Sequence, residues 1–354
     1  MDQNMVRKSE RRGEIDAAKG LALLSVVLGH VILLHTFPSN WIYTFHMPVF
    51  FFLSGMTFRP EKYDGLLPFL KDKARKRLLP YLGITALAFF ICMLRPAYRA
   101  PVLNDGWSHQ LLWVFYYTQP QNLYVGQLWF LVALFWAELM AWIWFQLAGK
   151  RHLLVKCYSV FLLALLAVRI QEINPYLPVG NRLPWKIDSA LCACVFLIAG
   201  YWTEKRRLLE RLRSAALVFI PLFTYLSFYF GPRLFGYVNI CDCVYVGAPY
   251  YYGAAFLGTA ALVLAGDFLK KSRLLCFIGR HSLPLFASQT FAIYLVIEGI
   301  AEVTGITYIP MFEMPGEKAC LLITLAALLL MLAGLWVYLE CKKWIFHRFS
   351  GKYL

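Results

Sequence analysis

The stretch RRGEIDAAKGLALLSVVLGH, residues 11–30, joins an apolar helix that could cross a bilayer to ionisable groups that lipid does not tolerate. From Gly20 onward it is almost wholly apolar. Yet Asp16 and Lys19 stand at the mouth of the predicted span 18–37, and His30 lies deep inside it. A charged side chain at the bilayer centre costs about 2.5–3.5 kcal/mol. The sequence therefore predicts a task or a partner for each of these groups.

The composition of the whole chain also indicates a membrane protein. Of its 354 residues, 60% are hydrophobic and 16% are charged, with a mean hydropathy of +0.57. A soluble domain is about half apolar and about a quarter charged. We expect a single all-α integral membrane domain over 1–354, with a cytoplasmic lead at 1–17 and a basic cytoplasmic tail at 341–354. The first apolar run lacks a small-residue cleavage site, so we interpret it as a transmembrane helix.

Ten segments are candidates for crossing the membrane, because a span needs about 20 mostly apolar residues. The run WSHQLLWVFYYT, residues 107–118, is half polar and is better interpreted as an interfacial segment. About ten transmembrane helices are therefore expected, near 18–37, 42–58, 79–95, 127–148, 153–170, 188–203, 215–231, 249–266, 281–300 and 319–340.

The distribution of basic residues predicts that both termini are cytoplasmic. With that orientation, 27 of the 35 Lys and Arg residues fall on the inner side, and Lys19 lies at the inner mouth of the first span. An excess of Lys and Arg marks the cytoplasmic side. Topology thus accounts for the net charge of +15, and no nucleic-acid partner is expected because no basic segment carries a reader motif. The remaining seven, on the predicted outer side, are Arg95, Arg99, Arg169, Arg182, Lys186, Arg233 and Lys318.

Lys19 and His30 share one face of the first span. They are 11 residues apart, which in an α-helix places them about 16 Å apart along the axis and within about 20° of each other around it. Asp16 precedes Lys19 by three residues, so these two are neighbours on the helix surface. Imidazole suits proton transfer near neutral pH. A helix-end ion pair for Asp16 and Lys19, and a structural role for His30, remain as alternatives.

A second histidine strengthens the functional interpretation. His46 lies in TFHMPVFFFLSG, residues 44–55, which opens the second predicted span from the outer side. A short outer turn joins the first two spans. Both imidazoles are therefore expected at similar depth in one cavity.

Two further spans begin with polar and aromatic residues at their predicted outer ends. They are GQLWFLVALF, residues 126–135, and LPWKIDSALCACVFLIAGY, residues 183–201. Aromatic rings at this level form interfacial belts, or they stack on sugar faces. The candidate substrate-binding residues are His46, Gln127, Trp129, Trp185 and Asp188.

The sequence motifs of several enzyme classes are absent from this chain. It has no G-x-x-x-x-G-K phosphate loop, no H-E-x-x-H and no G-x-S-x-G. Its nine cysteines mostly lie in apolar runs and do not have metal-ligand spacing, so no metal is expected. Cys241 and Cys243, in a predicted outer loop, remain open to pairing with another cysteine.

Taken in order, six stretches resemble the membrane-bound acyltransferase 3 family, and within it the fucose 4-O-acetylase-like branch. The stretches cover nearly the whole chain. They are DAAKG ending in His30, FHMPVFFFLSG, KARKRLLPYL, GQLWFLVALF, LPWKIDSALCACVFLIAGY and IGRHSLPLF.

The resemblance implies an O-acyltransferase that moves acetyl from cytoplasmic acetyl-CoA to a hydroxyl of an extracytoplasmic sugar or polysaccharide. It also implies a multi-pass protein of the bacterial cytoplasmic membrane. The family's basic residue, ten intervening residues and His match Lys19 and His30, with Asp16 beside them as part of the catalytic group. Many relatives carry a histidine where this chain has Gln289. By motif position, the acyl-CoA-binding residues are Lys73, Arg75 and Arg77.

Other functions stay open on the sequence alone. Ionisable groups inside a membrane also mark transporters or flippases for a small anion or a lipid-linked sugar. The acyl group could be succinyl, the acceptor could be an amino group, and the transfer could be direct or pass through an acyl-histidine.

Overall fold

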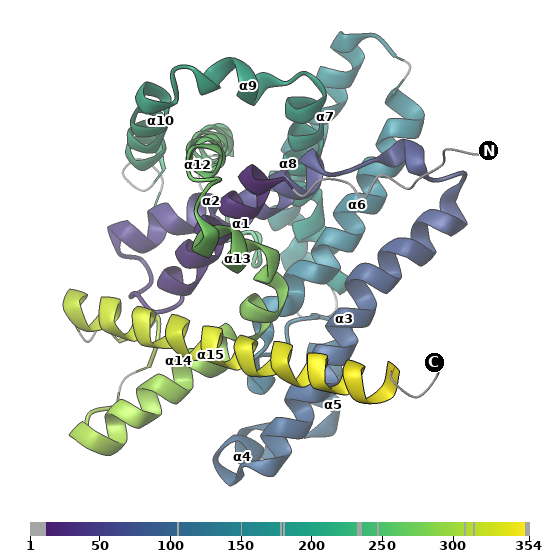
Figure 1. Cartoon of the computed structure of the whole chain (residues 1–354). Helices are drawn as coiled ribbons and strands as arrows, with labels where there is room; N and C mark the ends of the chain where they lie inside the picture. The colour runs from purple at the N-terminus through teal and green to yellow at the C-terminus, as the bar shows by residue number, and fades with distance from the viewer. Residues whose placement is uncertain are drawn as a thin grey trace.

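Every regular element in the described part of the chain is a helix (Figure 1). The computed structural model describes residues 12–104, 106–149, 151–177, 179, 181–231, 236–245, 248–307, 309–313 and 316–350. The predicted all-α class is confirmed for these residues, where β structure is limited to an isolated bridge between Asn239 and Val244. Most of the predicted lead 1–17 lies outside them.

The helices follow one another with short connections. The α-helices are α1 (Gly13–Gly29), α2 (Phe37–Met56), α3 (Leu66–Leu94), α4 (Pro96–Asn104), α5 (Trp107–Phe115), α6 (Trp129–Ala148), α7 (Leu153–Ile173), α8 (Ile187–Lys205), α9 (Leu208–Arg213), α10 (Ala216–Phe230), α12 (Ala248–Phe268), α13 (Arg273–Arg280), α14 (Ser282–Thr304) and α15 (Glu317–Ser350). Short 3₁₀ turns are η1 (Pro60–Lys62), η2 (Gln121–Leu123), η3 (Gly126–Leu128), η4 (Asn174–Tyr176) and η5 (Pro184–Lys186).

Each of the ten predicted segments overlaps a helix, but seven helices of the described chain are long and apolar enough to cross a membrane. They comprise α3, α6, α7, α8, α12, α14 and α15, some with an adjoining turn. Of the others, α1 has 17 residues and α10 has 15, while α2 carries several polar side chains. The chain is thus a multi-pass protein with seven candidate spans, and α5, with nine residues, is too short to be one.

Helices extend into two basic segments beyond the predicted spans. The stretch 69–81, which lies mostly between the predicted spans 42–58 and 79–95, forms the first half of α3. Lys, Arg and Leu are good helix formers, so the helix continues through the charged segment. Likewise, residues 341–350 of the predicted tail extend α15.

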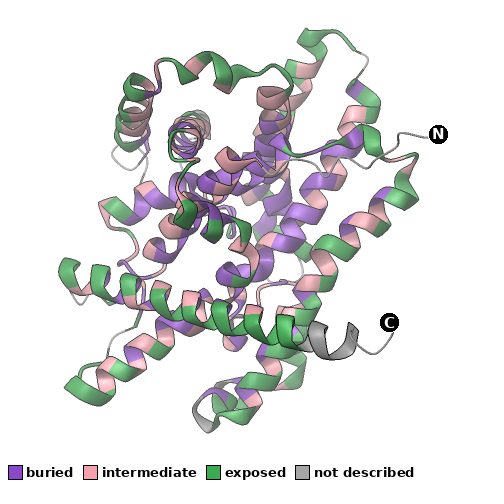
Figure 2. Cartoon of the chain, viewed as in Figure 1, coloured by how far each residue is buried: buried purple, intermediate pink, exposed green. Residues whose placement is uncertain are grey.

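The centre of the molecule contains α1, α2, α6, α8 and α12, which appear mostly buried in Figure 2. Glycines bring α2 and α8 into backbone contact. A Cβ at Gly55 would overlap the carbonyl of Leu197, and one at Gly200 would overlap the carbonyl of Phe52. Small residues at such crossings let membrane helices approach closely. This contact fixes the position of α2, which carries His46.

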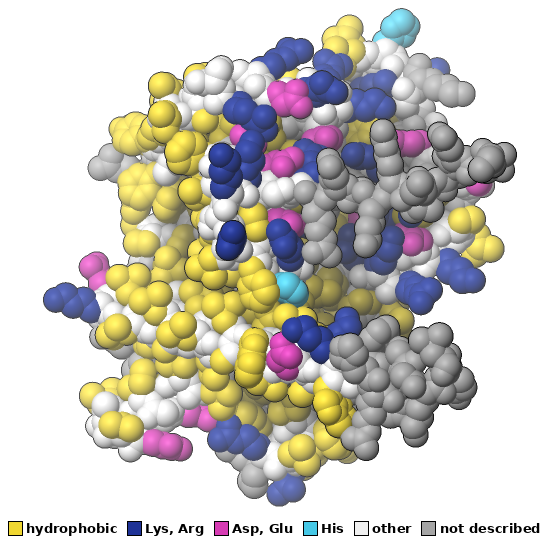
Figure 3. All heavy atoms as spheres, in the orientation of Figure 1, with side chains coloured by type: hydrophobic (Ala, Val, Ile, Leu, Met, Phe, Trp, Pro, Cys, Tyr) yellow, Lys and Arg dark blue, Asp and Glu magenta, His cyan; other side chains and the backbone are white. Residues whose placement is uncertain are grey.

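The outer helices expose apolar side chains instead. In its apolar window α7 is only 17% buried, and α3 only 22%. Leu154 and Phe161 of α7 and Leu322 and Leu329 of α15 are all exposed. In Figure 3 hydrophobic side chains form a broad region, and most Lys and Arg lie in the upper half, around α9 and α13. The exposed apolar side chains provide the surface that a bilayer covers.

Candidate active site

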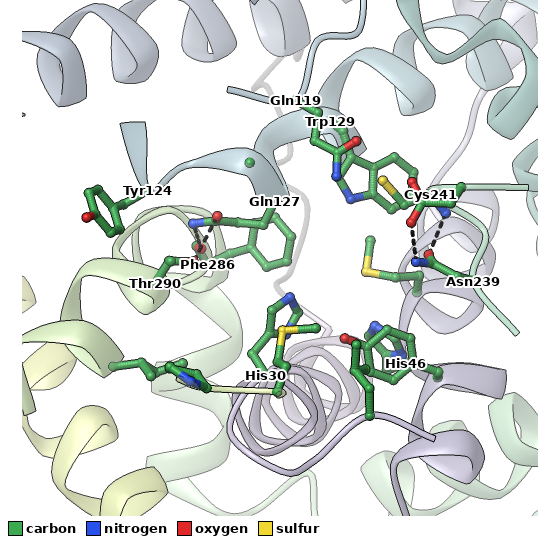
Figure 4. Close-up of a pocket in the computed structure, with 18 of the residues that line it drawn as sticks. His30, His46, Gln119, Tyr124, Gln127, Trp129, Asn239, Cys241, Phe286 and Thr290 are labelled. Atoms are coloured by element: carbon green, nitrogen blue, oxygen red, sulfur yellow. Dashed lines mark hydrogen bonds between the residues drawn. The ribbon is translucent and has the colours of Figure 1, made fainter. Parts of the chain in front are cut away.

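A cavity of about 530 Å³ contains both histidines of the predicted site (Figure 4). Its wall is built from the end of α1, from α2, from the turns before α6, from α14 and from the segments 237–242 and 310–312. The lining residues are His30, Leu34, Tyr43, His46, Met47, Gln119, Asn122, Tyr124, Gly126, Gln127, Trp129, Tyr237, Asn239, Cys241, Asp242, Phe286, Thr290, Ile293, Tyr294, Pro310, Met311 and Phe312.

The two imidazoles are close together. Their ring centroids are 6.5 Å apart, and the Tyr43 ring lies 4.7 Å from His46 and 6.3 Å from His30. Their positions along the helices differ from the prediction: His30 caps the end of α1, and His46 is near the middle of α2. The helix ends at Gly29, which packs against Ile42 of α2. The shorter α1 and longer α2 still bring both rings to one level.

Both rings are held in the same way. Nδ1 of His30 lies 2.8 Å from the carbonyl oxygen of Val26, and Nδ1 of His46 lies 2.8 Å from that of Ile42. A carbonyl oxygen only accepts hydrogen bonds, so Nδ1 carries the proton and donates it. In the neutral ring Nε2 then has the free lone pair. Each histidine is therefore oriented as a base by its own helix.

Gln127 and Trp129 also line the cavity, but they differ in what they can offer a ligand. The Gln127 amide is already used: Nε2 donates to the carbonyls of Phe286 and Ala287, and Oε1 accepts from Thr290. It therefore ties η3 to α14 (Figure 4). Trp129 presents an aromatic wall at the start of α6.

Trp185 and Asp188, predicted to bind substrate, are not among the residues that line the cavity. Trp185 is 37% exposed and sits in a left-handed turn with φ of 60°. Asp188 is fully buried and accepts from Arg182 Nε at 2.5 Å. Arg182 in turn donates to the carbonyl of Cys241. Through Arg182, Asp188 thus supports the segment 237–242, which forms one wall of the cavity.

Residues of the segments 119–124 and 237–242, which were not predicted from the sequence, also line the cavity. Asn239 donates to Tyr237 Oη at 3.0 Å and to Asp242 Oδ2 at 2.6 Å. Burial, reinforced by the Asp242 carboxylate, raises the pKa of Tyr237 to about 12. On the opposite segment Gln119 accepts from Lys186 at 2.9 Å. The available signal was the grouping of amides and acids in QPQN, residues 119–122, and NICD, residues 239–242.

Near the start of α1, Asp16 and Lys19 lie on the helix surface as predicted, but Asp16 pairs elsewhere. Its Oδ2 lies 3.1 Å from Arg280 Nε, at the end of α13. In the described chain Lys19 makes no hydrogen bond, and the charged groups that act on it are Asp16 and Arg77. Lys19 is not among the residues that line the histidine cavity.

The predicted donor-binding residues separate into two kinds. Lys73 donates to Glu138 Oε1 at 2.9 Å, and Arg77 donates to both oxygens of Glu138 at 3.0 and 3.1 Å. Glu138 is 1% exposed. Helical spacing explains the division, because residues four apart share a face and Arg75 points away from it. Arg75 is exposed and has no ion pair or hydrogen bond among the described residues.

Gln289 is fully buried in α14, and neither atom of its side-chain amide has a hydrogen-bond partner in the described chain. It lies one turn from Phe286 and from Ile293, which line the cavity. All nine cysteines are free, including Cys241 and Cys243. The described residues contain no group of three or more His, Cys, Asp or Glu arranged to hold a metal ion.

A family model described as an acyltransferase domain, acyltransferase 3, matches residues 12–340. The match includes α1 with Asp16 and Lys19, its C-cap His30, and α2 with His46. It also includes the basic part of α3 and the segments 119–124 and 237–242 of the cavity. No curated protein and no solved structure gives a match.

Proposed function

Because the chain belongs to the acyltransferase 3 family of membrane acyltransferases, we propose that it O-acetylates an extracytoplasmic sugar or polysaccharide with acetyl-CoA. The observation that carries the proposal is the pair of imidazoles in one cavity, each with Nδ1 bound to its own helix. Two bases with free Nε2 atoms suit the removal of a proton from a hydroxyl group.

The reaction begins with the acceptor hydroxyl at His30. Nε2 of His30 takes the hydroxyl proton, and the oxygen attacks the carbonyl carbon of the thioester. The carbon–sulfur bond then breaks, and the sulfur leaves as a thiolate that takes up the proton from the imidazolium. An ester on the sugar and free coenzyme A are the products. His46 and Tyr43, whose rings contact each other, hold the acceptor next to His30.

The acceptor enters from the side of segments 119–124 and 237–242. Gln119, Tyr124 and Tyr237 offer hydrogen-bonding groups to sugar hydroxyls, and Trp129 offers an aromatic face. Sugars are commonly bound by this combination of polar groups with an apolar ring, because their two faces differ in polarity. These residues support a sugar acceptor over a purely apolar one.

The donor's phosphates bind on the inner basic surface. Of the three residues predicted to bind acyl-CoA, Arg75 is exposed and has no ion pair among the described residues. A guanidinium can bind phosphate through two hydrogen bonds. Lys73 and Arg77 hold α3 against α6 through Glu138. The acyl arm follows α1 from Lys19, which has no hydrogen-bond partner in the described chain, toward His30. This path covers about 16 Å.

Substitution of His30 tests the proposal. We expect His30→Ala to lower the rate of acetyl transfer by roughly 10²–10⁴-fold, since a positioned base contributes this much. The measurement is transfer of labelled acetyl from acetyl-CoA to sugar acceptors by purified protein in lipid vesicles. His152→Ala is the matched control, because His152 is exposed and does not line the cavity.

The result that contradicts the proposal is unchanged transfer by His30→Ala. If wild-type protein moves labelled sugar or anion across the vesicle membrane without any transfer of label between molecules, the chain is a transporter. Succinyl-CoA supplied in parallel identifies the preferred acyl group, and a stable labelled protein adduct would show that transfer passes through an acyl-enzyme.

A further inference from the structure

The lining of the cavity contains a negative side chain but no Lys or Arg, among the described residues. Within the described chain Asp242 is the one carboxylate among its lining residues, and no Lys or Arg lines it. The Asp242 side chain is 48% exposed, and its Oδ2 accepts from Asn239. The carboxylate therefore retains unused acceptor positions. A ligand in the cavity can therefore contact the Asp242 carboxylate, whereas no Lys or Arg side chain lines the cavity in the described chain.

Arg182 and Lys186 contact residues that line the cavity but do not line it themselves. The Arg182 side chain is 16% exposed and is engaged by Asp188 and by the carbonyl of Cys241. Its nearest approach to Asp242 is 3.6 Å. Lys186 is 4% exposed, and its Nζ donates to Gln119 and to the carbonyl of Cys241. Asp242 is thus paired with Arg182 at the wall, whereas Lys186 lies behind Gln119 and Cys241, and neither cation lines the cavity.

Asp242 is also close to the reacting groups. It interacts with Tyr237, whose ring lies 5.4 Å from that of Tyr43. The Tyr43 ring in turn lies 4.7 Å from His46. Asn239 also donates to both Tyr237 and Asp242, so the carboxylate, Tyr237 and Tyr43 belong to one wall of the cavity, which leads to His46.

We propose that Asp242 determines acceptor specificity: it binds hydroxyl groups of a neutral sugar and rejects sugars that carry a carboxylate. The inference rests on the proposed O-acyltransferase function and adds the class of acceptor. An ionised carboxylate only accepts hydrogen bonds, so it binds hydroxyl groups and repels a second carboxylate. It also pairs with Arg182, which would otherwise attract an acidic sugar.

The test uses matched acceptors that differ only in a CH₂OH or a COO⁻ group, such as glucoside and glucuronoside oligosaccharides. We expect wild-type protein to have a kcat/KM roughly tenfold or more higher for the neutral acceptor, as expected for a site built around hydroxyl groups. Asp242→Asn should lower transfer to the neutral acceptor and raise transfer to the acidic one, because the repelling carboxylate is lost and Arg182 loses its partner at the cavity wall.

Two controls separate selectivity from damage to the fold. Glu172→Gln removes an exposed carboxylate that does not line the cavity, and it should leave the ratio of the two kcat/KM values unchanged. In the wild-type protein the discrimination should also weaken as salt concentration rises, because salt screens charge repulsion. This second measurement does not depend on a variant that folds.

The outcomes distinguish the two proposals. Absence of transfer to any sugar overturns the proposed function. Transfer to sugars with equal kcat/KM for both acceptors, or an unchanged ratio in Asp242→Asn, overturns the specificity inference alone.

Discussion

At the scale of single residues, the site depends on how local hydrogen bonds prepare side chains. His30 and His46 each donate from Nδ1 to the carbonyl four residues earlier, so each helix orients its own base. Asp188 is instead bound by Arg182 and supports the segment 237–242. His30 and Asp188 both lie near helix ends, yet their contacts give them different roles.

Cys243, next to this arginine, should be chemically inert. Burial, with the nearby Asp188 carboxylate, raises the pKa of its thiol to about 12, so almost no thiolate exists at pH 8. The thiolate is the reactive form. We expect alkylation by iodoacetamide at pH 8 to be slow in the folded protein and to accelerate on unfolding. Peptide mass spectrometry after timed labelling measures this, and rapid labelling of the native protein would contradict it.

At the scale of elements, the contact between α2 and α8 positions His46. Gly55 and Gly200 place the two backbones so close that neither position has room for a Cβ. The helix that carries the second imidazole is thus held by backbone packing. His30 depends on this contact too, because α1 ends against α2 at Gly29.

Gly200→Val should separate these helices. The added side chain would meet the backbone of Phe52, and overpacking typically costs about 1–3 kcal/mol. We expect a lower unfolding temperature in detergent and a loss of acyl transfer, because His46 moves relative to His30. Gly83→Val is the matched control, since a Cβ at Gly83 in α3 has no heavy atom within 4 Å. Equal effects of both substitutions would contradict this account.

At the scale of the whole molecule, a buried centre is surrounded by helices whose apolar faces point outward. The outer helix α3 is held to the central α6 by a buried cluster of charges, in which Lys73 and Arg77 share Glu138. The Lys73 ammonium is further surrounded by the rings of Phe58 and Phe69, at 5.0 and 5.6 Å. The cluster couples the basic surface to the centre of the protein.

Glu138→Gln should weaken this coupling strongly. It leaves two cations without their carboxylate, and breaking a buried ion pair costs about 3–5 kcal/mol. We expect a marked fall in thermal stability in detergent, measured by the loss of monodisperse protein on heating. Glu340→Gln is the control, since Glu340 is exposed and pairs with Lys343. A small effect at position 138, comparable to the control, would show that the cluster contributes little.

Much of the helical framework could be predicted from hydropathy. Each predicted span overlaps a helix, because a long apolar run in a membrane must satisfy its backbone hydrogen bonds internally. The ends of helices were harder to predict. α1 ends at Gly29, where this residue packs against Ile42 of α2, and no local pattern specifies that contact. The basic stretch of α3 lay mostly between two predicted spans, because its charges exclude it from an apolar segment although its residues favour a helix.

The sequence by itself determined that this is a helical membrane protein with histidines on its first two helices, because hydropathy and helical spacing are local properties. Only the tertiary structure decided which polar groups meet. It brought Tyr237, Asn239 and Asp242 to the histidine cavity, and it placed Lys73 and Arg77 on Glu138 instead of in solvent. These pairings join residues far apart in the chain, and charge or spacing along one segment carries no information about the partner that packing supplies.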